Sequence, residues 1–257
     1  DTMQPTSNAA RQDASAAQNR GLVLVRALSP LAALLGLLAW SALAAADPPS
    51  DWAQRMRACT ACHGSEGIRI EEGYVPRIEG KPAGYLFNQL VNFREHRRTH
   101  ATMNHLVAWM SDDYLAAIAD WFAEQEPPYP EPAEAPAREA LRERGARLVR
   151  SGDPDRDIPA CQACHGERLA GVQPNTPGLI GLPEHYIAGQ LGAWRIGRRE
   201  AAEPDCMSAI VERMNERDVE AVSAWLASRD LPDDTRPAAE PVDDPPMRCG
   251  SVERPAS

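Results

Sequence analysis

A short string that occurs twice constrains the fold more than any other feature. CTACHG at residues 59–64 returns as CQACHG at residues 161–166, an offset of 102. Further matches follow at offsets of 101 and then 104. They pair Pro76, Tyr85, Gln89, Phe93, Arg94 and Arg98 with Pro177, Tyr186, Gln190, Trp194, Arg195 and Arg199, and Met103, Met110, Ala117 and Trp121 with Met207, Met214, Ala221 and Trp225. Chance does not produce such a series, so the chain contains two copies of one domain of about 80 to 100 residues.

Proline-rich segments separate and follow the two copies. The string EPPYPEPAEAPA at residues 126–137 is typical of an extended, semi-rigid linker. A second segment, rich in Pro and Asp, runs over residues 233–257 and forms an acidic tail. The predicted domains are therefore residues 47–125 and residues 138–232.

Within both copies the apolar residues recur at helical spacing. This spacing predicts helices over 82–97, from Ser111 to about residue 124, over 137–151, over 184–195 and over 216–227. Ser111 is expected to be the N-cap of its helix. The sequence contains no alternating apolar pattern of any length. The predicted fold class is therefore all-α, with two small helical domains in tandem.

The first 46 residues (1–46) are typical of an export signal. Residues 27–46 carry no charge, arginines precede them, and Ala44 and Ala46 fit a cleavage site before Asp47. This layout predicts a signal peptide. The alternative is a retained membrane anchor through residues 27–46, because a run of about 20 uncharged residues just spans a bilayer. In both cases the rest of the chain is exported, and we expect a periplasmic location.

The CxxCH pattern points to specific chemistry in an exported protein. Two cysteines with two residues between them place both sulfur atoms against the vinyl groups of one porphyrin, and the next residue directs its imidazole at the iron. A zinc site would need four ligands, and a redox disulfide would need a thioredoxin-like context. Neither is present in the sequence, so we predict two covalently bound c-type haems. Their anchors and iron ligands are Cys59, Cys62 and His63 for one haem, and Cys161, Cys164 and His165 for the other.

The repeat also discriminates among candidates for the sixth iron ligand. Three histidines of the first copy have no histidine counterpart in the second copy, whereas two methionine pairs recur. The pair that directly precedes the next helix is expected to pack in the core. The other pair lies in the segment before it, which is expected to be a loop, and supplies the predicted sixth ligands. An iron with both axial positions filled is closed to substrates. No catalytic residue is therefore predicted. The ligands are Met103 and Met207, the packing residues Met110 and Met214, and the histidines His96, His100 and His105.

Two repeated prolines suggest how the histidines are oriented. A haem-ligating histidine usually donates its second N–H to a carbonyl or a carboxylate. Pro76 and Pro177 occupy matching positions from which a backbone carbonyl could accept that hydrogen bond. The alternative is that these prolines only stiffen a loop.

The residues described so far resemble cytochrome c4, a family of two-domain, di-haem class I cytochromes c. The likeness runs from about residue 52 to residue 231. Beside the CxxCH strings, it rests on VPRIEGKPAGYLFNQLVNFREHRR and MNHLVAWMSDDYLAAIADWF in the first copy, and on TPGLIGLPEHYIAGQLGAWRIGRR and MSAIVERMNERDVEAVSAWL in the second. The resemblance implies two tandem class I cytochrome c domains, each wrapped around one haem, packed with their propionate edges near each other.

The resemblance also implies a function. It predicts an electron carrier between respiratory or photosynthetic complexes, for example from a quinol-oxidising complex to a terminal oxidase of the cbb3 type. The alternative is an electron-transfer subunit of a dehydrogenase such as flavocytochrome c sulfide dehydrogenase. The net charge of −10 disfavours nucleic acid as a partner and implies redox partners with basic docking surfaces.

Three features depart from the family pattern: the N-terminal segment, the tail and two additional cysteines. Six cysteines minus four haem anchors leave Cys206 and Cys249. In an oxidising compartment this even remainder predicts a disulfide. Because Cys206 directly precedes Met207, such a bridge would clamp the tail beside the second methionine segment. The tail itself is either a solvated extension or a docking segment.

Overall fold

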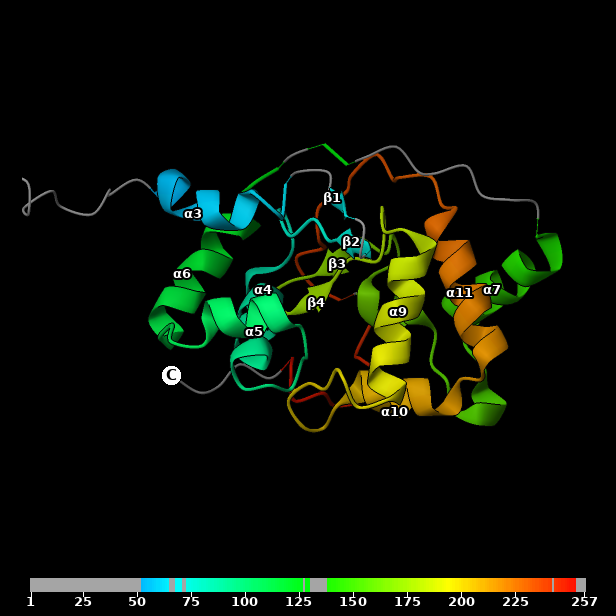
Figure 1. The fold of residues 1–257 in the computed structure, drawn as a ribbon. Helices are drawn as coiled ribbons and strands as arrows, with labels where there is room; N and C mark the ends of the chain where they lie inside the picture. Colours follow the sequence, from blue (N-terminus) through cyan, green and yellow to red (C-terminus); the bar gives the residue numbers. More distant parts are fainter. Residues whose placement is uncertain are drawn as a thin grey trace, which may run out of the picture. The chain divides into compact units, whose positions relative to one another are not determined.

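Figure 1 shows the fold, taken from a computed structural model. It describes residues 52–64, 68–70, 73–126, 128–129, 138–241 and 243–252. These residues belong to one compact unit that begins at Trp52. The predicted export segment 1–46 and most of the predicted linker 126–137 lie outside the described residues. Within the described part of the chain, every helix is too short or too polar to cross a membrane.

In the first copy, the described helices surround a small apolar core. The elements are α3 (Trp52–Thr60), β1 (Ile68–Ile70), β2 (Gly73–Val75), α4 (Ala83–Arg94), α5 (Ala101–Val107) and α6 (Asp112–Ala123). α4 and α6 lie against each other. The apolar residues of α6 recur every three or four positions, so they share the face that points to the core. The core consists of Met56, Leu86, Phe93, Val107, Leu115, Ile118, Ala119 and Phe122.

The second copy repeats this order with one change. Its elements are α7 (Glu139–Ser151), the 3-10 turn η1 (Pro154–Arg156), α8 (Cys161–His165), β3 (Gly171–Val172), β4 (Thr176–Pro177), α9 (Glu184–Arg195), α10 (Cys206–Arg213) and α11 (Glu216–Ala227). The change is the turn between α7 and α8, because in the first copy α3 runs directly into the CxxCH string. The core includes Leu148, Val149, Ile187, Val211, Val222 and Trp225.

In the second copy, α7 and α11 cross at close range. Gly145 of α7 permits this, because a Cβ atom there would lie 2.1 Å from the carbonyl oxygen of Ala221 on α11. Asp218 of α11 is fully buried and accepts hydrogen bonds from Arg144 Nε at 2.8 Å and from Arg156 at 2.7 Å. The two guanidinium groups compensate the desolvation of the carboxylate, so the crossing combines close packing with a buried ion pair.

The helix predictions are confirmed, with small changes at the ends. The helices predicted over 184–195 and 216–227 coincide with α9 and α11, and the Ser111 hydroxyl caps α6 as predicted. α4 ends three residues before the predicted boundary of 97. The reason is local, because His96 adopts a φ of 60°, in the left-handed region that interrupts an α-helix.

Two features of the fold differ from the expectation. β1 pairs antiparallel with β2, and β3 with β4, in strands of two or three residues that are too short to show an alternating pattern. The methionine segments, expected to be loops, are helical: Met103 lies in α5 and Met207 in α10. Each helix begins at a side-chain cap, since His100 accepts from the Met103 N–H and Asp205 accepts from the Ser208 N–H.

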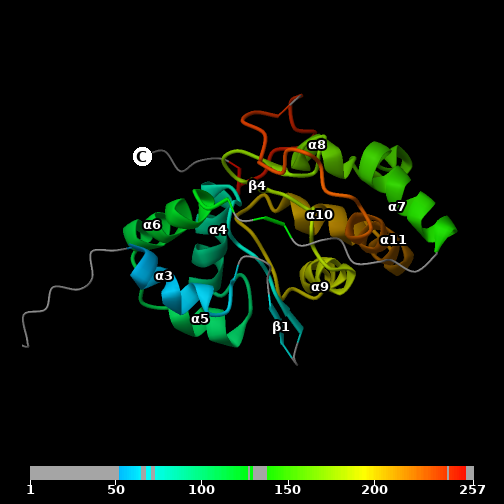
Figure 2. The ribbon, with the colours of Figure 1, turned by 90° about the horizontal axis from the view of Figure 1, so that it is seen from above.

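The two copies meet through equivalent segments. The chain after α4 pairs with the chain after α9 in an antiparallel bridge between Arg98 and Arg199. The flanking residues exchange two backbone hydrogen bonds of 2.9 and 2.7 Å. α4 also lies against β4 of the second copy (Figures 1 and 2). Because the repeat pairs Arg98 with Arg199, the same surface of each copy makes the contact, in a pseudo-twofold arrangement.

Candidate cofactor sites

The second CxxCH string forms helix α8, which contains Cys161, Cys164 and His165. The Nδ1–H group of His165 donates a hydrogen bond to the Pro177 carbonyl oxygen at 2.7 Å. A carbonyl can only accept, so the contact selects the tautomer in which Nε2 keeps its lone pair. His165 is therefore oriented as a metal-ligating imidazole usually is.

A cavity beside α8 gathers the predicted ligands of the second haem. Cys161, Cys164, His165 and Met207 all line its wall. Tyr85 and other residues of the first copy line it as well, so α4 covers one side of the cavity. The structure thus brings together the four residues that the sequence assigned to the second site.

Burial determines the protonation of this site. It raises the pKa of Cys161 to about 12 and also raises the pKa of Cys164. Burial lowers the pKa of His165, and the hydrogen bond to Pro177 opposes this shift only in part. At neutral pH the imidazole is therefore neutral, which is the form that binds a metal. The thiols are protonated, so they are poor nucleophiles in this state.

The first CxxCH string occupies the end of α3 and the turn after it. The Nδ1–H group of His63 donates to the Pro76 carbonyl oxygen at 2.8 Å. Burial lowers the pKa of His63 and raises that of the Cys59 thiol. Cys59 and Met103 pack against the same apolar cluster, whereas the Cys62 side chain is exposed. The first site therefore repeats the histidine geometry of the second in a more open setting.

Two subsidiary predictions about the sites are confirmed. Pro76 and Pro177 both supply the carbonyl that accepts from the histidine, as one of the two interpretations proposed. Met110 and Met214 pack in the cores: Met214 is 7% exposed, and Met110 lies against the apolar cluster of the first copy. Met103 and Met207 pack against the same two clusters, and Met214 also lines the cavity of the second site, so packing alone does not separate the two methionine pairs.

The donor set of the CxxCH strings suits thioether attachment. Cys59, Cys62, Cys161 and Cys164 form no disulfide. Among the described residues, no group of three or more His, Cys, Asp or Glu side chains could hold a metal ion by itself. Unbridged cysteine pairs, each followed by a histidine, are the groups to which a c-type haem attaches.

A partly buried polar cluster lies where the two copies meet, and the sequence reasoning assigned it no role. Arg98 donates to the side-chain oxygens of Gln89 at 3.0 Å and Gln190 at 2.7 Å. Arg199 donates to the same two oxygens at 3.3 and 2.7 Å. In the described part of the chain, neither guanidinium has a carboxylate within ion-pair distance.

This cluster concentrates positive charge in a buried place. Burial, and then the charge of Arg98, lowers the pKa of Arg199 to about 10. A buried cation beside a second, half-buried cation is unfavourable unless an anion accompanies them. The repeat contained a signal for this cluster. Gln89 and Arg98 recur as Gln190 and Arg199, although neither residue type is needed to build a helical core.

The comparisons with known proteins identify the family, although no family model matches. The chain is 36% identical over 205 residues to the "Thiosulfate dehydrogenase electron acceptor" of Thiomonas intermedia. The match covers 77% of this chain and 89% of that protein. It is 30% identical over 170 residues to cytochrome c4 of Pseudomonas aeruginosa, covering 65% of this chain and 82% of that one. The chain belongs to the cytochrome c4 family. It is a di-haem c-type cytochrome, an electron carrier and not an enzyme.

Solved structures agree with this assignment. Reduced cytochrome c4 from Pseudomonas stutzeri matches with a TM-score of 0.56 at 27% identity, over 68% of this chain and 95% of that chain. A thiosulfate dehydrogenase from Marichromatium purpuratum matches with a TM-score of 0.58 at 31% identity, over 67% of this chain. The match covers only 36% of the thiosulfate dehydrogenase chain, so this protein spans about a third of the length of that chain.

The residues of this protein fit two haem c groups. Each copy offers an unbridged CxxC pair and a histidine whose Nδ1 is already engaged, and the second copy adds a cavity with Met207 in its wall. The polar cluster fits as well, because haem carries propionate carboxylates and Arg98 and Arg199 lack a carboxylate partner among the described residues. The expected pair of haem c cofactors is therefore consistent with the charges and donors of this chain.

Proposed function

We propose that this di-haem cytochrome accepts single electrons from a thiosulfate dehydrogenase. The observation that carries the proposal is the 36% identity to a protein of that role over 89% of that protein's length. The match includes both haem-binding copies, so it concerns the whole carrier and not one haem motif. The general role of electron carrier is common to the family, and the proposal adds the donor.

We also propose the ligand sets. Each haem is attached by one CxxC pair and held between the Nε2 atom of a histidine and a methionine sulfur. The support is the tautomer selected at each histidine, the recurrence of the two methionines in the repeat, and the place of Met207 in the cavity wall with His165. The sets are Cys59, Cys62, His63 and Met103 for the first haem, and Cys161, Cys164, His165 and Met207 for the second.

The residues around the sites limit the structural change that accompanies electron transfer. When bound, each haem supplies a one-electron Fe(III)/Fe(II) couple. The Pro76 and Pro177 carbonyls fix the histidine rings, and the methionines, both half-buried, pack against the apolar cores. Arg98 and Arg199 provide positive charge for the propionates and join the copies, so both sites belong to one unit. With ligands held in place, little has to rearrange during transfer.

We propose a periplasmic location and docking to basic partner surfaces. The structure supports the location through the Cys206–Cys249 disulfide, because such bonds persist in oxidising compartments. The net charge of −10 supports association with a positively charged surface, at a rate that falls with ionic strength. The domain boundaries 47–125 and 138–232 stand as part of the same proposal.

Rapid mixing tests the proposed donor. The purified ferric cytochrome is mixed with a catalytic amount of thiosulfate dehydrogenase, and the rise of the ferrous absorption band is followed after thiosulfate is added. We expect both haems to become reduced, with rates that decrease as salt increases. Mixtures without thiosulfate, or without the dehydrogenase, should remain ferric.

Competing donors make the test decisive. The same cytochrome is mixed with a quinol-oxidising complex and quinol, and separately with a flavoprotein sulfide dehydrogenase and sulfide. The proposal is wrong if thiosulfate dehydrogenase leaves the haems ferric while one of these donors reduces them rapidly. The role of electron carrier would survive that result, and only the identity of the donor would change.

A further inference from the structure

The acidic tail returns to the body of the second copy. Shortly after the end of α11, Asp234 of the tail forms an ion pair with Arg168 of the second copy, with a nitrogen–oxygen distance of 3.4 Å. The Ala238 N–H then donates to the Gly171 carbonyl at 2.9 Å, and the Gln173 N–H donates to the Ala238 carbonyl at 2.8 Å. The tail therefore pairs with β3 and is not simply a solvated extension.

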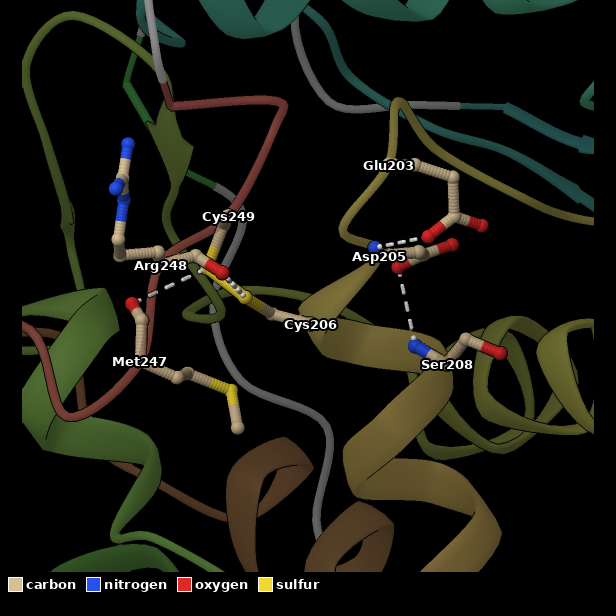
Figure 3. Close-up of a disulfide and its surroundings, with 7 residues drawn as sticks. All are labelled: Glu203, Asp205, Cys206, Ser208, Met247, Arg248 and Cys249. Carbon is tan, nitrogen blue, oxygen red and sulfur yellow. Dashed lines mark hydrogen bonds between the residues drawn. A yellow bond between two sulfur atoms is a disulfide. The ribbon is translucent and has the colours of Figure 1, made fainter.

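The tail then becomes covalently attached beside the second methionine segment. Cys249 forms a disulfide with Cys206, the first residue of α10, with the Cα atoms 5.4 Å apart (Figure 3). This confirms the predicted bridge. The next residue, Gly250, donates its N–H to the Pro204 carbonyl at 3.0 Å, so the tail holds α10 and the segment before it. Met207 is the neighbour of Cys206 in the chain.

Beyond the disulfide, the tail reaches both copies. Asn88 of α4 in the first copy donates to the Ser251 carbonyl at 2.8 Å, and Asn175 of the second copy donates to the Val252 carbonyl at 2.9 Å. Cys249, Ser251 and Val252 line the same cavity as His165 and Met207. The end of the described tail is therefore part of the wall of the second haem site.

Among the described residues of the first copy there is no equivalent of this arrangement. The residue that matches Cys206 at the offset of 104 is Thr102, which is exposed and cannot form a disulfide. The attachment of the tail therefore distinguishes two sites that otherwise use the same types of ligand.

We propose that residues 238–241 and 243–252 form a strap that positions the Met207 segment and closes the second haem pocket. The strap acts through the Cys206–Cys249 disulfide and through the contacts of Ser251 and Val252. Opening it frees the start of α10, so the methionine leaves the iron more often and external ligands enter more readily. The first haem is unaffected. This inference rests on the proposed ligation of the second haem by Met207.

Imidazole binding to the haem-loaded, full-length ferric protein tests the strap. Imidazole competes with the methionine, so its binding is followed as loss of the methionine–Fe(III) charge-transfer band. The wild type should show two phases, and the Met207→Ala variant identifies the phase of the second haem by lacking it. In a Cys206→Ser/Cys249→Ser variant, we expect the second-haem phase to accelerate by at least about tenfold, while the first-haem phase stays unchanged.

Milder variants keep the test independent of whether the double cysteine variant folds. Asn88→Ala and Asn175→Ala each remove one hydrogen bond to the strap and should accelerate the same phase by about two- to fivefold. The matched control is Asp243→Asn/Asp244→Asn, which changes two exposed carboxylates of the same tail. This control should keep both wild-type phases.

The outcomes separate the strap from the ligation on which it rests. If both phases stay at their wild-type rates in the cysteine and asparagine variants, or accelerate equally, the strap is overturned and methionine ligation stands. If the wild type has no methionine band at the second haem, the ligation by Met207 is wrong and the strap falls with it.

Discussion

The two methionine segments carry equivalent methionines, Met103 and Met207, but different interactions hold the two segments in place. In the first copy, Asn104 fastens α5 to the end of α4. Its side-chain amide donates to the carbonyls of Phe93 and Arg98, and its carbonyl oxygen accepts from the His100 N–H at 2.7 Å. Asn104 is 8% exposed, so these hydrogen bonds are shielded from water. This buried amide, together with the His100 cap, thus holds the start of the segment.

In the second copy, a carboxylate and a disulfide replace that amide. Asp205 caps α10, and its second oxygen accepts from Trp194 Nε1 at 3.1 Å and from the Ala201 N–H at 2.7 Å. Cys206 adds the covalent link to the tail. The position of Asn104 is taken by Ser208.

This difference separates two kinds of residue. The residues predicted to contact the haem are the same in both copies, because the cofactor needs the same donors twice. The residues that hold those donors differ, because several hydrogen-bond arrangements can place a short helix equally well. The comparison predicts that changes behind the ligands affect one copy at a time.

The largest single effect is expected at Asp218, the buried carboxylate of the second copy. Asp218→Asn removes the charge partner of Arg144 and leaves Arg156 paired with Asp153 alone, so the free energy of unfolding should fall by about 3–5 kcal/mol. Denaturant unfolding, followed by absorbance and circular dichroism, measures the loss. The matched position of the first copy is Tyr114, and Tyr114→Phe should change stability by less than about 0.5 kcal/mol. Equal losses in the two variants would contradict the comparison.

The same carboxylate predicts a pH dependence. Burial acts to raise the pKa of Asp218, but hydrogen bonds from Arg156, the Asn215 N–H and Arg144 overcome it and hold the pKa below its usual value. The stabilisation is therefore present above the pKa of the unfolded chain and is lost as pH falls through the lower folded pKa. The stability gap between wild type and Asp218→Asn should shrink in acid. A gap that stays constant down to acid unfolding would refute this origin.

The close crossing of α7 and α11 gives the next effect. Gly145→Ala places a methyl group against the Ala221 carbonyl, so we expect a loss of about 1–3 kcal/mol as the helices move apart. Gly189 is a matched control in α9, where an added Cβ has nothing within 4 Å. Gly189→Ala should be neutral or stabilising by up to about 1 kcal/mol. Thermal unfolding of both variants measures the contrast, and a neutral Gly145→Ala would show that the crossing is not tight.

Asn104 gives the smallest change in stability but the sharpest test of the first copy. Asn104→Ala removes the hydrogen bonds that hold α5 and should cost about 1–2 kcal/mol. In the imidazole assay it should accelerate only the first-haem phase, the reverse of the strap variants. Acceleration of the second-haem phase would mean that the two methionine segments are not held independently.

Sequence reasoning succeeded where the signal is local. α9 and α11 were predicted to the residue, because apolar residues recur at helical spacing along both segments. The Cys206–Cys249 disulfide followed from counting cysteines in an oxidising compartment. The histidine–carbonyl contacts followed from the repetition of Pro76 and Pro177.

Sequence reasoning failed where structure depends on short elements or distant contacts. α5 and α10 are only seven and eight residues long, too short for periodicity to reveal them. The cap of α5 is the ring of His100, which is not a usual capping residue. The polar cluster joins side chains about a hundred positions apart, such as Arg98 and Gln190, and only the folded chain brings them together.

The central claim is that both copies hold a haem between a histidine and a methionine. The most direct measurement is the optical spectrum of the ferric protein with haem quantitation, for wild type, Met103→Ala, Met207→Ala and the double variant. The account predicts two haems per chain, with about half of the methionine–Fe(III) band lost in each single variant and all of it lost in the double variant. One haem per chain, or a single variant that keeps the full band, would contradict it.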